Sequence, residues 1–261
     1  MTPEDLAAVG LRLEIAGPVA TVTLDRPEVR NAQTPAMWLA LGQLGRDLPD
    51  DVRVVVVTGE GDTFSAGLDR AMLDPATSGE ESVVGLLALS DDEAAARIDA
   101  FQGGFTWLRD PRFVSIAKVR GYAIGAGFQL ALSCDLRVVA DDARFSMKES
   151  ALGLVPDLTG TKPLVEHVGY ARALEICATA RMVPADEAVA IGLATRSVPA
   201  AELDAAVDAL AAALAAPMAG VVPETKALLL GAAGRDLDEQ RRLEREAQVR
   251  RFRAVAAAFA G

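Results

Sequence analysis

The sequence has very few of the residues that build metal sites and nucleophilic triads. Its 261 residues include one histidine, His167, and two cysteines, Cys134 and Cys177. Zinc sites of the His₃, Cys₄ and Cys₂His₂ kinds, or a framework of several disulfides, cannot be assembled from that inventory. His167 lies at a predicted helix end with no nucleophile motif beside it. We therefore expect no metal, and acid–base chemistry that depends on carboxylates with electrophilic help from backbone amides.

Positive charge is also scarce, since 26 Lys and Arg face 37 Asp and Glu and the net charge is −11. Such a surface repels phosphate backbones and anionic lipids, so we expect no nucleic-acid or membrane partner. A small anionic ligand can still be held by a few local donors. The first residues have neither the basic nor the apolar part of a signal peptide. Together with two free cysteines, this predicts a cytoplasmic protein.

The first 60 residues alternate between strand and helix patterns. Residues 11–24 alternate apolar and polar side chains around a Gly-Pro pair, which predicts a β-hairpin. A helix is predicted over residues 34–48, and the four consecutive valines 54–57 are typical of a strand buried on both faces. This order of hairpin, helix and buried strand predicts an α/β fold.

Strands are also expected at residues 114–119 and 136–139, with a helix over 126–133 between them. Beyond about residue 158 the pattern becomes helical, interrupted by a short strand near 194–198. The remaining predicted helices are 91–108, 162–167, 171–179, 185–191, 201–216, 222–230 and 236–259. We expect a core over residues 1–198 and a helical C-terminal region over residues 199–261.

Small residues follow two of the predicted strands, in Phe64–Gly67 and in Gly125-Ala126-Gly127. Small residues at the start of a helix leave unpaired backbone N–H groups that a ligand can approach, and the helix dipole adds positive potential. Two such amides converging on one carbonyl oxygen would form an oxyanion hole. The alternative interpretation is tight packing of strand on helix.

Two acidic residues, Glu149 and Asp157, lie among apolar neighbours rather than in a run of charges. A carboxylate in an apolar pocket has a raised pKa, which suits a general acid or base. Either residue could instead cap a helix or lie on the surface.

Four segments in order resemble the crotonase (enoyl-CoA hydratase/isomerase) superfamily, and the resemblance covers nearly the whole chain. Each short motif is weak alone, but four in the right order at the right spacing are specific. The segments are Leu24–Ala32, Phe64–Asp69, Gly121–Ala131 with the following Cys134-Asp135, and Phe145–Glu149 with Gly153–Pro156.

The resemblance implies a crotonase-like spiral of ββα units with a helical C-terminal region that forms trimers, commonly paired into hexamers. It implies an acyl-CoA thioester as substrate and no metal or redox cofactor. The family's two oxyanion-hole amides fall on Ala66 and Ala126. Since the protein is acidic, the CoA phosphates must meet local cations. The predicted substrate-binding residues are Arg26, Arg30, Ala32, Ala66, Gly67, Leu68, Asp69, Ala126, Gln129 and Lys226.

The chain departs from the hydratase pattern at Gln129. Hydratases that it resembles have glutamates at the positions of Gln129 and Glu149, and a glutamine cannot exchange a proton. Some family isomerases have an aspartate at the position of Asp157. The predicted acid–base pair is therefore Glu149 and Asp157, and the favoured function is a double-bond shift in an enoyl-CoA. The alternatives are an enoyl-CoA hydratase and a non-catalytic acyl-CoA-binding protein.

Overall fold

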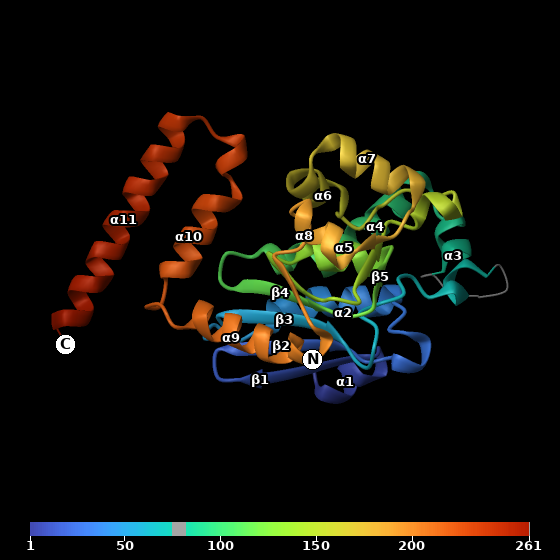
Figure 1. The fold of residues 1–261 in the computed structure, drawn as a ribbon, viewed down its shortest axis with the longest axis horizontal. Helices are drawn as coiled ribbons and strands as arrows, with labels where there is room; N and C mark the ends of the chain where they lie inside the picture. Colours follow the sequence, from blue (N-terminus) through green and yellow to red (C-terminus); the bar gives the residue numbers. More distant parts are fainter. Residues whose placement is uncertain (75–81, 261) are drawn as a thin grey trace.

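The computed structural model describes residues 1–74 and 82–260. Figure 1 shows a body of strands and helices, from which the last two helices extend to one side. The strands are β1 Leu11–Ala16, β2 Val19–Leu24, β3 Val54–Gly59, β4 Val114–Val119, β5 Tyr122–Ile124, β6 Leu136–Ala140, β7 Arg144–Ser146, β8 Val183–Pro184 and β9 Arg196–Val198. The α-helices are α1 Pro3–Ala8, α2 Pro35–Asp47, α3 Val83–Leu87, α4 Asp91–Thr106, α5 Ala126–Ser133, α6 Thr161–Val168, α7 Tyr170–Thr179, α8 Ala185–Ala190, α9 Leu203–Ala215, α10 Val221–Leu230 and α11 Leu237–Ala260.

A six-stranded sheet in the order β1-β2-β3-β4-β6-β9 forms the centre of the body. The predicted hairpin is confirmed, because β1 and β2 pair antiparallel, whereas the pairs from β2 to β9 are all parallel. All six residues of β3 are buried. Parallel strands covered on both faces read as continuous apolar runs, which explains the valines of β3.

The two faces of β3 belong to two different cores. Val55 and Val57 join the main core, which α2, α4 and α5 also line. Val54 and Val56 pack with Leu203 and other residues of α9 on the opposite face. Successive side chains of a strand point to opposite faces, so one run of valines supports both layers. The predicted division at residue 198 remains a prediction.

Helix α2 begins where the sequence predicts it. Thr34 is its N-cap, with its side-chain oxygen accepting a hydrogen bond from the Met37 amide at 3.3 Å, and Pro35 occupies the first turn. The helix packs closely on α4, where a Cβ added to Gly104 would lie 2.3 Å from the carbonyl oxygen of Trp38. This close approach requires glycine.

A second sheet of three short strands, in the order β5-β7-β8, was not predicted from the sequence. Its strands have two or three residues each, too few to show a periodic pattern. The chain runs from β4 to β5 to α5, and again from β6 to β7 to α6. Each time a strand of the large sheet is followed by a strand of the small sheet and a helix. This repetition gives the predicted spiral of ββα units.

The conformation of the loop after β3 is fixed by the small sheet. Ser65 forms an isolated parallel bridge with Ala123 of β5, and its amide donates to the Tyr122 carbonyl at 2.8 Å. The two segments of small residues singled out in the sequence therefore lie side by side. Among the described residues, no helix combines the length and apolarity needed to cross a membrane.

The single histidine has a structural partner. The buried guanidinium of Arg137 lies 2.8 Å from His167 Nε2 and donates to the carbonyl oxygens of Cys134 and Ala131. A guanidinium only donates, so Nε2 must accept and the imidazole is neutral. Burial, with repulsion from Arg137, lowers the pKa of His167 to about 4.

We expect this contact to make the protein sensitive to mild acid. Between pH 6.5 and about 4 the unfolded histidine binds a proton that the folded one excludes, so stability falls as the pH falls. With allowance for partial exposure, the loss is about 1–2 kcal/mol. Urea unfolding at a series of pH values measures it. His167→Gln keeps an acceptor for Arg137, and an unchanged pH slope in that variant would contradict the assignment.

Candidate active site

The loop Phe64–Asp69 holds its shape through buried hydrogen bonds. The Ser65 hydroxyl donates to the Asn31 carbonyl at 2.7 Å and accepts from Gln33 Nε2 at 3.1 Å. The Gly67 carbonyl accepts from the Gln33 amide at 2.7 Å. Gly67 has φ +90°, a conformation that favours glycine. These hydrogen bonds therefore fix the directions in which the backbone amides of the loop point.

Three of the four amides from Ala66 to Asp69 already have partners. The Ala66 N–H donates to the Arg30 carbonyl at 2.9 Å, that of Gly67 to the Ser65 hydroxyl at 3.2 Å, and that of Asp69 to the Gln33 carbonyl at 2.8 Å. Within the described chain, the Leu68 N–H has no partner. The geometry therefore corrects the assignment of an oxyanion-hole donor to Ala66: the available donor on this loop is Leu68.

The second predicted donor, Ala126, is the first residue of α5. Its N–H lies in the first helical turn, where no helical carbonyl can accept it, and the N-cap Gly125 provides no side-chain cap. A Cβ added to Gly67 would lie 2.5 Å from the Ile124 carbonyl oxygen and 3.5 Å from the Ala126 amide nitrogen. The loop and the helix N-terminus therefore meet, as an oxyanion hole requires.

Glu149 lies beside this helix N-terminus. It is 8% exposed, and a Cβ added to Gly125 would lie 3.5 Å from its Oε1. Oε1 accepts a 2.7 Å hydrogen bond from Gln129 Nε2, whereas the buried Oε2 has no partner among the described residues. Burial raises the pKa of Glu149, and repulsion from Asp157 adds to the rise. The carboxylate thus has one fixed oxygen and one free oxygen beside the candidate donors.

Asp157 lies within electrostatic range of Glu149, the other predicted carboxylate. Asp157 is exposed at the surface, yet the protein around it partly desolvates its carboxyl group and raises its pKa. Its carbonyl oxygen accepts a 2.7 Å hydrogen bond from Gln102 of α4. Of the two, Glu149 has the more enclosed carboxyl group.

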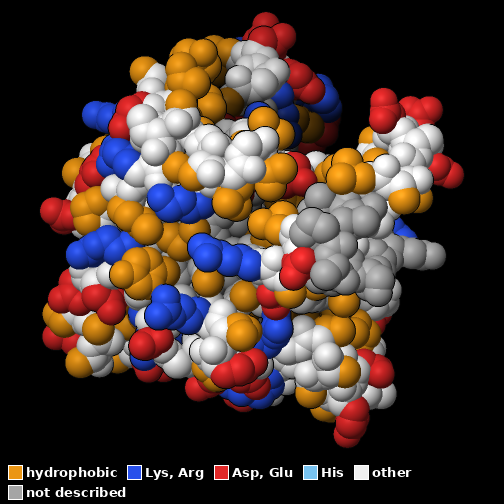
Figure 2. Space-filling model, turned by 90° about the vertical axis from the view of Figure 1, so that its right-hand side faces the viewer, with side chains coloured by type: hydrophobic (Ala, Val, Ile, Leu, Met, Phe, Trp, Pro, Cys, Tyr) orange, Lys and Arg blue, Asp and Glu red, His pale blue; other side chains and the backbone are white. Residues whose placement is uncertain are grey.

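Of the predicted cationic residues, some form ion pairs or hydrogen bonds within the protein, and others have no side-chain partner among the described residues. Arg26 pairs with Asp69 at 3.0 Å and donates to the Ala32 carbonyl at 2.8 Å, so these three residues brace the loop. Arg30 is exposed, and so is Arg70, which the sequence analysis did not single out. Within the described residues neither has a side-chain partner. Figure 2 shows Lys and Arg side chains gathered with apolar ones on one face of this acidic protein.

Lys226 does not fit its predicted role. It is 7% exposed, and its ammonium group contacts Asp135 Oδ2 at 2.7 Å and the carbonyl oxygens of Asp110 and Phe113 at 2.7 and 2.8 Å. All three of its N–H donors are used. Lys226 therefore anchors α10 to the strand ends and has no donor left for a phosphate.

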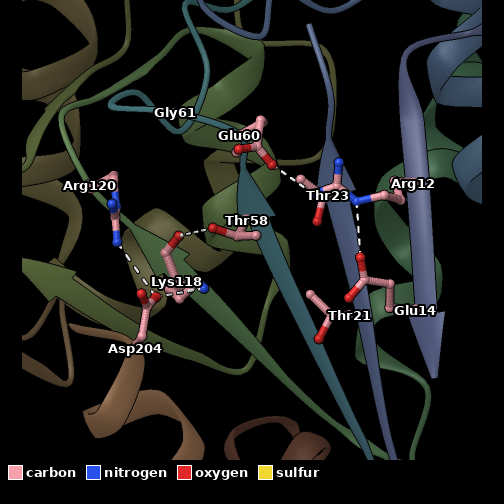
Figure 3. Close-up of a pocket in the computed structure, with 11 residues that line it drawn as sticks. Arg12, Glu14, Thr21, Thr23, Thr58, Glu60, Gly61, Lys118, Arg120 and Asp204 are labelled. Carbon is pink, nitrogen blue, oxygen red and sulfur yellow. Dashed lines mark hydrogen bonds and ion pairs between the residues drawn. The ribbon is translucent and has the colours of Figure 1, made fainter. Parts of the chain in front are cut away.

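A polar hollow of about 260 Å³ lies elsewhere, across strands β1 to β4 (Figure 3). Its cations are paired within the hollow or at its edge. Arg12 lies 2.6 Å from Glu60, and Lys118 lies 2.8 Å from Asp204, which also pairs with Arg120. The residues that line it do not include Glu149, Asp157, Leu68 or Ala126, which we call the Glu149 cluster. Because these cations are already paired with carboxylates, the hollow offers an anion few available hydrogen-bond donors. The Glu149 cluster is therefore the stronger candidate for the active site.

Comparison with known proteins finds relatives that cover most of the chain. Residues 14–256 match the sequence model of the enoyl-CoA hydratase/isomerase family. A candidate enoyl-CoA hydratase from Thermobifida fusca YX, solved with acetoacetyl-CoA, is 54% identical over 97% of this chain and 98% of its own, with a TM-score of 0.93. Its complex with CoA covers 98% of both chains, with a TM-score of 0.92. The short-chain-enoyl-CoA hydratase of Clostridium acetobutylicum is 33% identical over 73% of this chain and 69% of its own.

The chain therefore has the crotonase fold and belongs to the enoyl-CoA hydratase/isomerase family, which is a family of enzymes.

Proposed function

We propose that this enzyme acts on acyl-CoA thioesters and shifts the double bond of an enoyl-CoA. The observation that carries the proposal is the buried carboxylate of Glu149 beside the N-terminus of α5. Among the described residues, neither its Oε2 nor the N–H groups of Leu68 and Ala126 have a hydrogen-bond partner. The position where hydratases of the family have a second glutamate holds the neutral Gln129. The acetoacetyl-CoA and CoA complexes of the Thermobifida fusca relative support a CoA thioester as ligand.

The reaction needs only proton transfer between two carbons. A carboxylate removes an α proton from a 3-enoyl thioester, and the negative charge moves to the thioester oxygen. The N–H groups of Leu68 and Ala126 would stabilise that oxygen. A proton then returns at the γ carbon, with Glu149 and Asp157 as the two candidate carriers. Since no electrons are exchanged with a second reactant, the proposed reaction needs no redox cofactor. We also propose that the enzyme uses no metal and works in the cytoplasm.

Hydration of a 2-enoyl-CoA is the second candidate, and the name of the Clostridium acetobutylicum relative favours it. In that case Gln129 would orient the attacking water by hydrogen bonds alone. Measuring both reactions on the unmodified protein, with short and medium chains, decides between them. Hydration that is faster than isomerisation across these chains would overturn the assignment. CoA binding with neither reaction would favour a non-catalytic acyl-CoA-binding protein.

We expect Arg30 to contact a CoA phosphate, since no described residue pairs with its exposed side chain and its carbonyl accepts a hydrogen bond from the Ala66 N–H. Arg30→Glu should therefore weaken CoA binding at low salt, where screening is least, by more than changes of the acyl chain do. Calorimetric titration with CoA measures the effect. Arg46→Glu, on the last turn of α2, changes the net charge equally and serves as the control. Equal affinities of the two variants would contradict the assignment.

We also propose a trimer or a hexamer. Phe252 and Phe259 of α11 are 64% and 88% exposed in the single chain, and Val249 is 47% exposed. Apolar surface of this kind commonly marks a protein interface. Light scattering at micromolar concentration should give the mass of three or six subunits. A monomer mass would show that this face is not covered by further copies.

A further inference from the structure

The side chain of Gln129 is fully buried and connects two parts of the site. Its Oε1 accepts hydrogen bonds from the amides of Leu158 and Gly160, at 2.9 and 3.2 Å. Its Nε2 donates to Glu149 Oε1 at 2.7 Å. One carboxamide therefore holds both the buried carboxylate and the backbone that follows Asp157.

The orientation of this carboxamide has only one chemical solution. Backbone N–H groups are donors, so the two amides require the carbonyl oxygen of Gln129 on their side. The NH₂ group must then face Glu149, whose Oε1 has to be an unprotonated acceptor. Of the two oxygens of Glu149, only Oε2 remains free to take a proton.

The same carboxamide shapes the turn after Asp157. The two residues whose N–H groups donate to it, Leu158 and Gly160, flank Thr159, which has φ +69°. A Cβ added to Gly160 would lie 2.6 Å from Gln129 Cγ, so the turn presses directly on this side chain. The backbone that follows Asp157 is therefore held by the same side chain that binds Glu149.

We propose that Gln129 is a positioning residue that selects Oε2 of Glu149 as the proton acceptor and sets its placement relative to Asp157. The inference rests on the proposed function, in which Glu149 carries a proton. Gln129 occupies the position of the second glutamate of hydratases. It fixes the geometry of Glu149 and of the turn after Asp157 without adding a second acidic group.

Replacing Gln129 by Glu separates its role in holding the backbone after Asp157 from its role in binding Glu149 without adding an acidic group. A glutamate keeps the acceptor for both backbone amides, but it faces Glu149 Oε1 with an oxygen across a hydrogen-bond distance. Two acceptors at that distance must share a proton, which raises the pKa of the pair. Of the other groups near Glu149, Asp157 carries a charge and Cys177 of α7 a neutral thiol, and neither is changed by this substitution.

The test compares Gln129→Glu, Gln129→Leu and Gln102→Leu. Gln102 binds the Asp157 carbonyl from α4 and has no hydrogen bond to Glu149, so its variant controls for loosening of the turn. For exchange of the substrate's α proton, the acidic limb of kcat against pH should move up by about one unit in Gln129→Glu, which is about tenfold in kcat below that limb. In Gln129→Leu, kcat should fall about 10²-fold at every pH with little change in KM.

The control variant should keep the unmodified pH profile. An unmoved acidic limb in Gln129→Glu, or the same movement in Gln102→Leu, would overturn the proposal. If the unmodified protein exchanges no α proton, the proposed function fails, and the positioning role is then tested directly. Infrared difference spectra against matching Glu149→Gln variants follow the titration of Glu149 without substrate. A raised titration midpoint in Gln129→Glu supports the role, and an unchanged one refutes it.

Discussion

Glu149→Gln should lower isomerisation by about 10²–10⁴-fold, the usual loss when a general acid or base is removed. Because the carboxamide introduced at this position can still accept the hydrogen bond of Gln129 through its carbonyl oxygen, the variant should fold and bind CoA normally. Turnover of a 3-enoyl-CoA, followed by the absorbance of the conjugated product, measures the loss. The unmodified enzyme should also lose activity as the pH falls through the raised pKa of Glu149, since the base must be unprotonated.

Asp157→Asn should also reduce isomerisation strongly without abolishing CoA binding. The double variant should lose little more than the worse single variant, because both carboxylates serve one proton path. Glu166→Gln is a suitable control, since Glu166 is a surface carboxylate paired with Lys162 on α6. Full activity in Glu149→Gln would exclude Glu149 as the base. Strictly additive losses would place the two carboxylates on separate steps.

Strands of the large sheet could be predicted from the sequence because most of them carry enough residues to show a pattern. The valines of β3 indicate burial on both faces, whereas β2, its neighbour in the sheet, is indicated by the alternation of apolar and polar residues in the hairpin. The small sheet could not be predicted in this way. Its strands are too short to show a period. They form by pairing with one another, and the paired segments are separated in the sequence by longer strands and helices.

The site shows a similar limit. Residue types and the family resemblance indicate Glu149, Asp157 and the N-terminus of α5. The structure places Glu149 beside that helix N-terminus and Asp157 within electrostatic range of Glu149. Which amide is free depends on hydrogen bonds between segments far apart in sequence, such as that from Ala66 to the Arg30 carbonyl. The sequence contains no local signal for that bond. Likewise, the partners of the buried Lys226 come from loops more than 90 residues earlier in the chain.

The position of the oxyanion hole gives the second large expected effect. Leu68→Pro removes the one unpaired N–H of the loop, because proline has no amide hydrogen. The loss of one such donor should lower kcat about 10²–10³-fold. Leu68→Ala keeps the amide and changes only the side chain, so it should retain most of the turnover. Steady-state kinetics of both variants, with thermal unfolding to verify the fold, measures the difference.

Crowding the other donor tests the same oxygen from the opposite side. Ala126→Val places two methyl groups at the start of α5 and should cost about 2–4 kcal/mol of transition-state stabilisation if the thioester oxygen loses its contact. Ala126 is 5% exposed, so there is little free space for the added atoms. Near-normal turnover in a folded Leu68→Pro variant would move the hole away from Leu68. Near-normal turnover in Ala126→Val as well would show that the oxygen is stabilised outside this pair of amides.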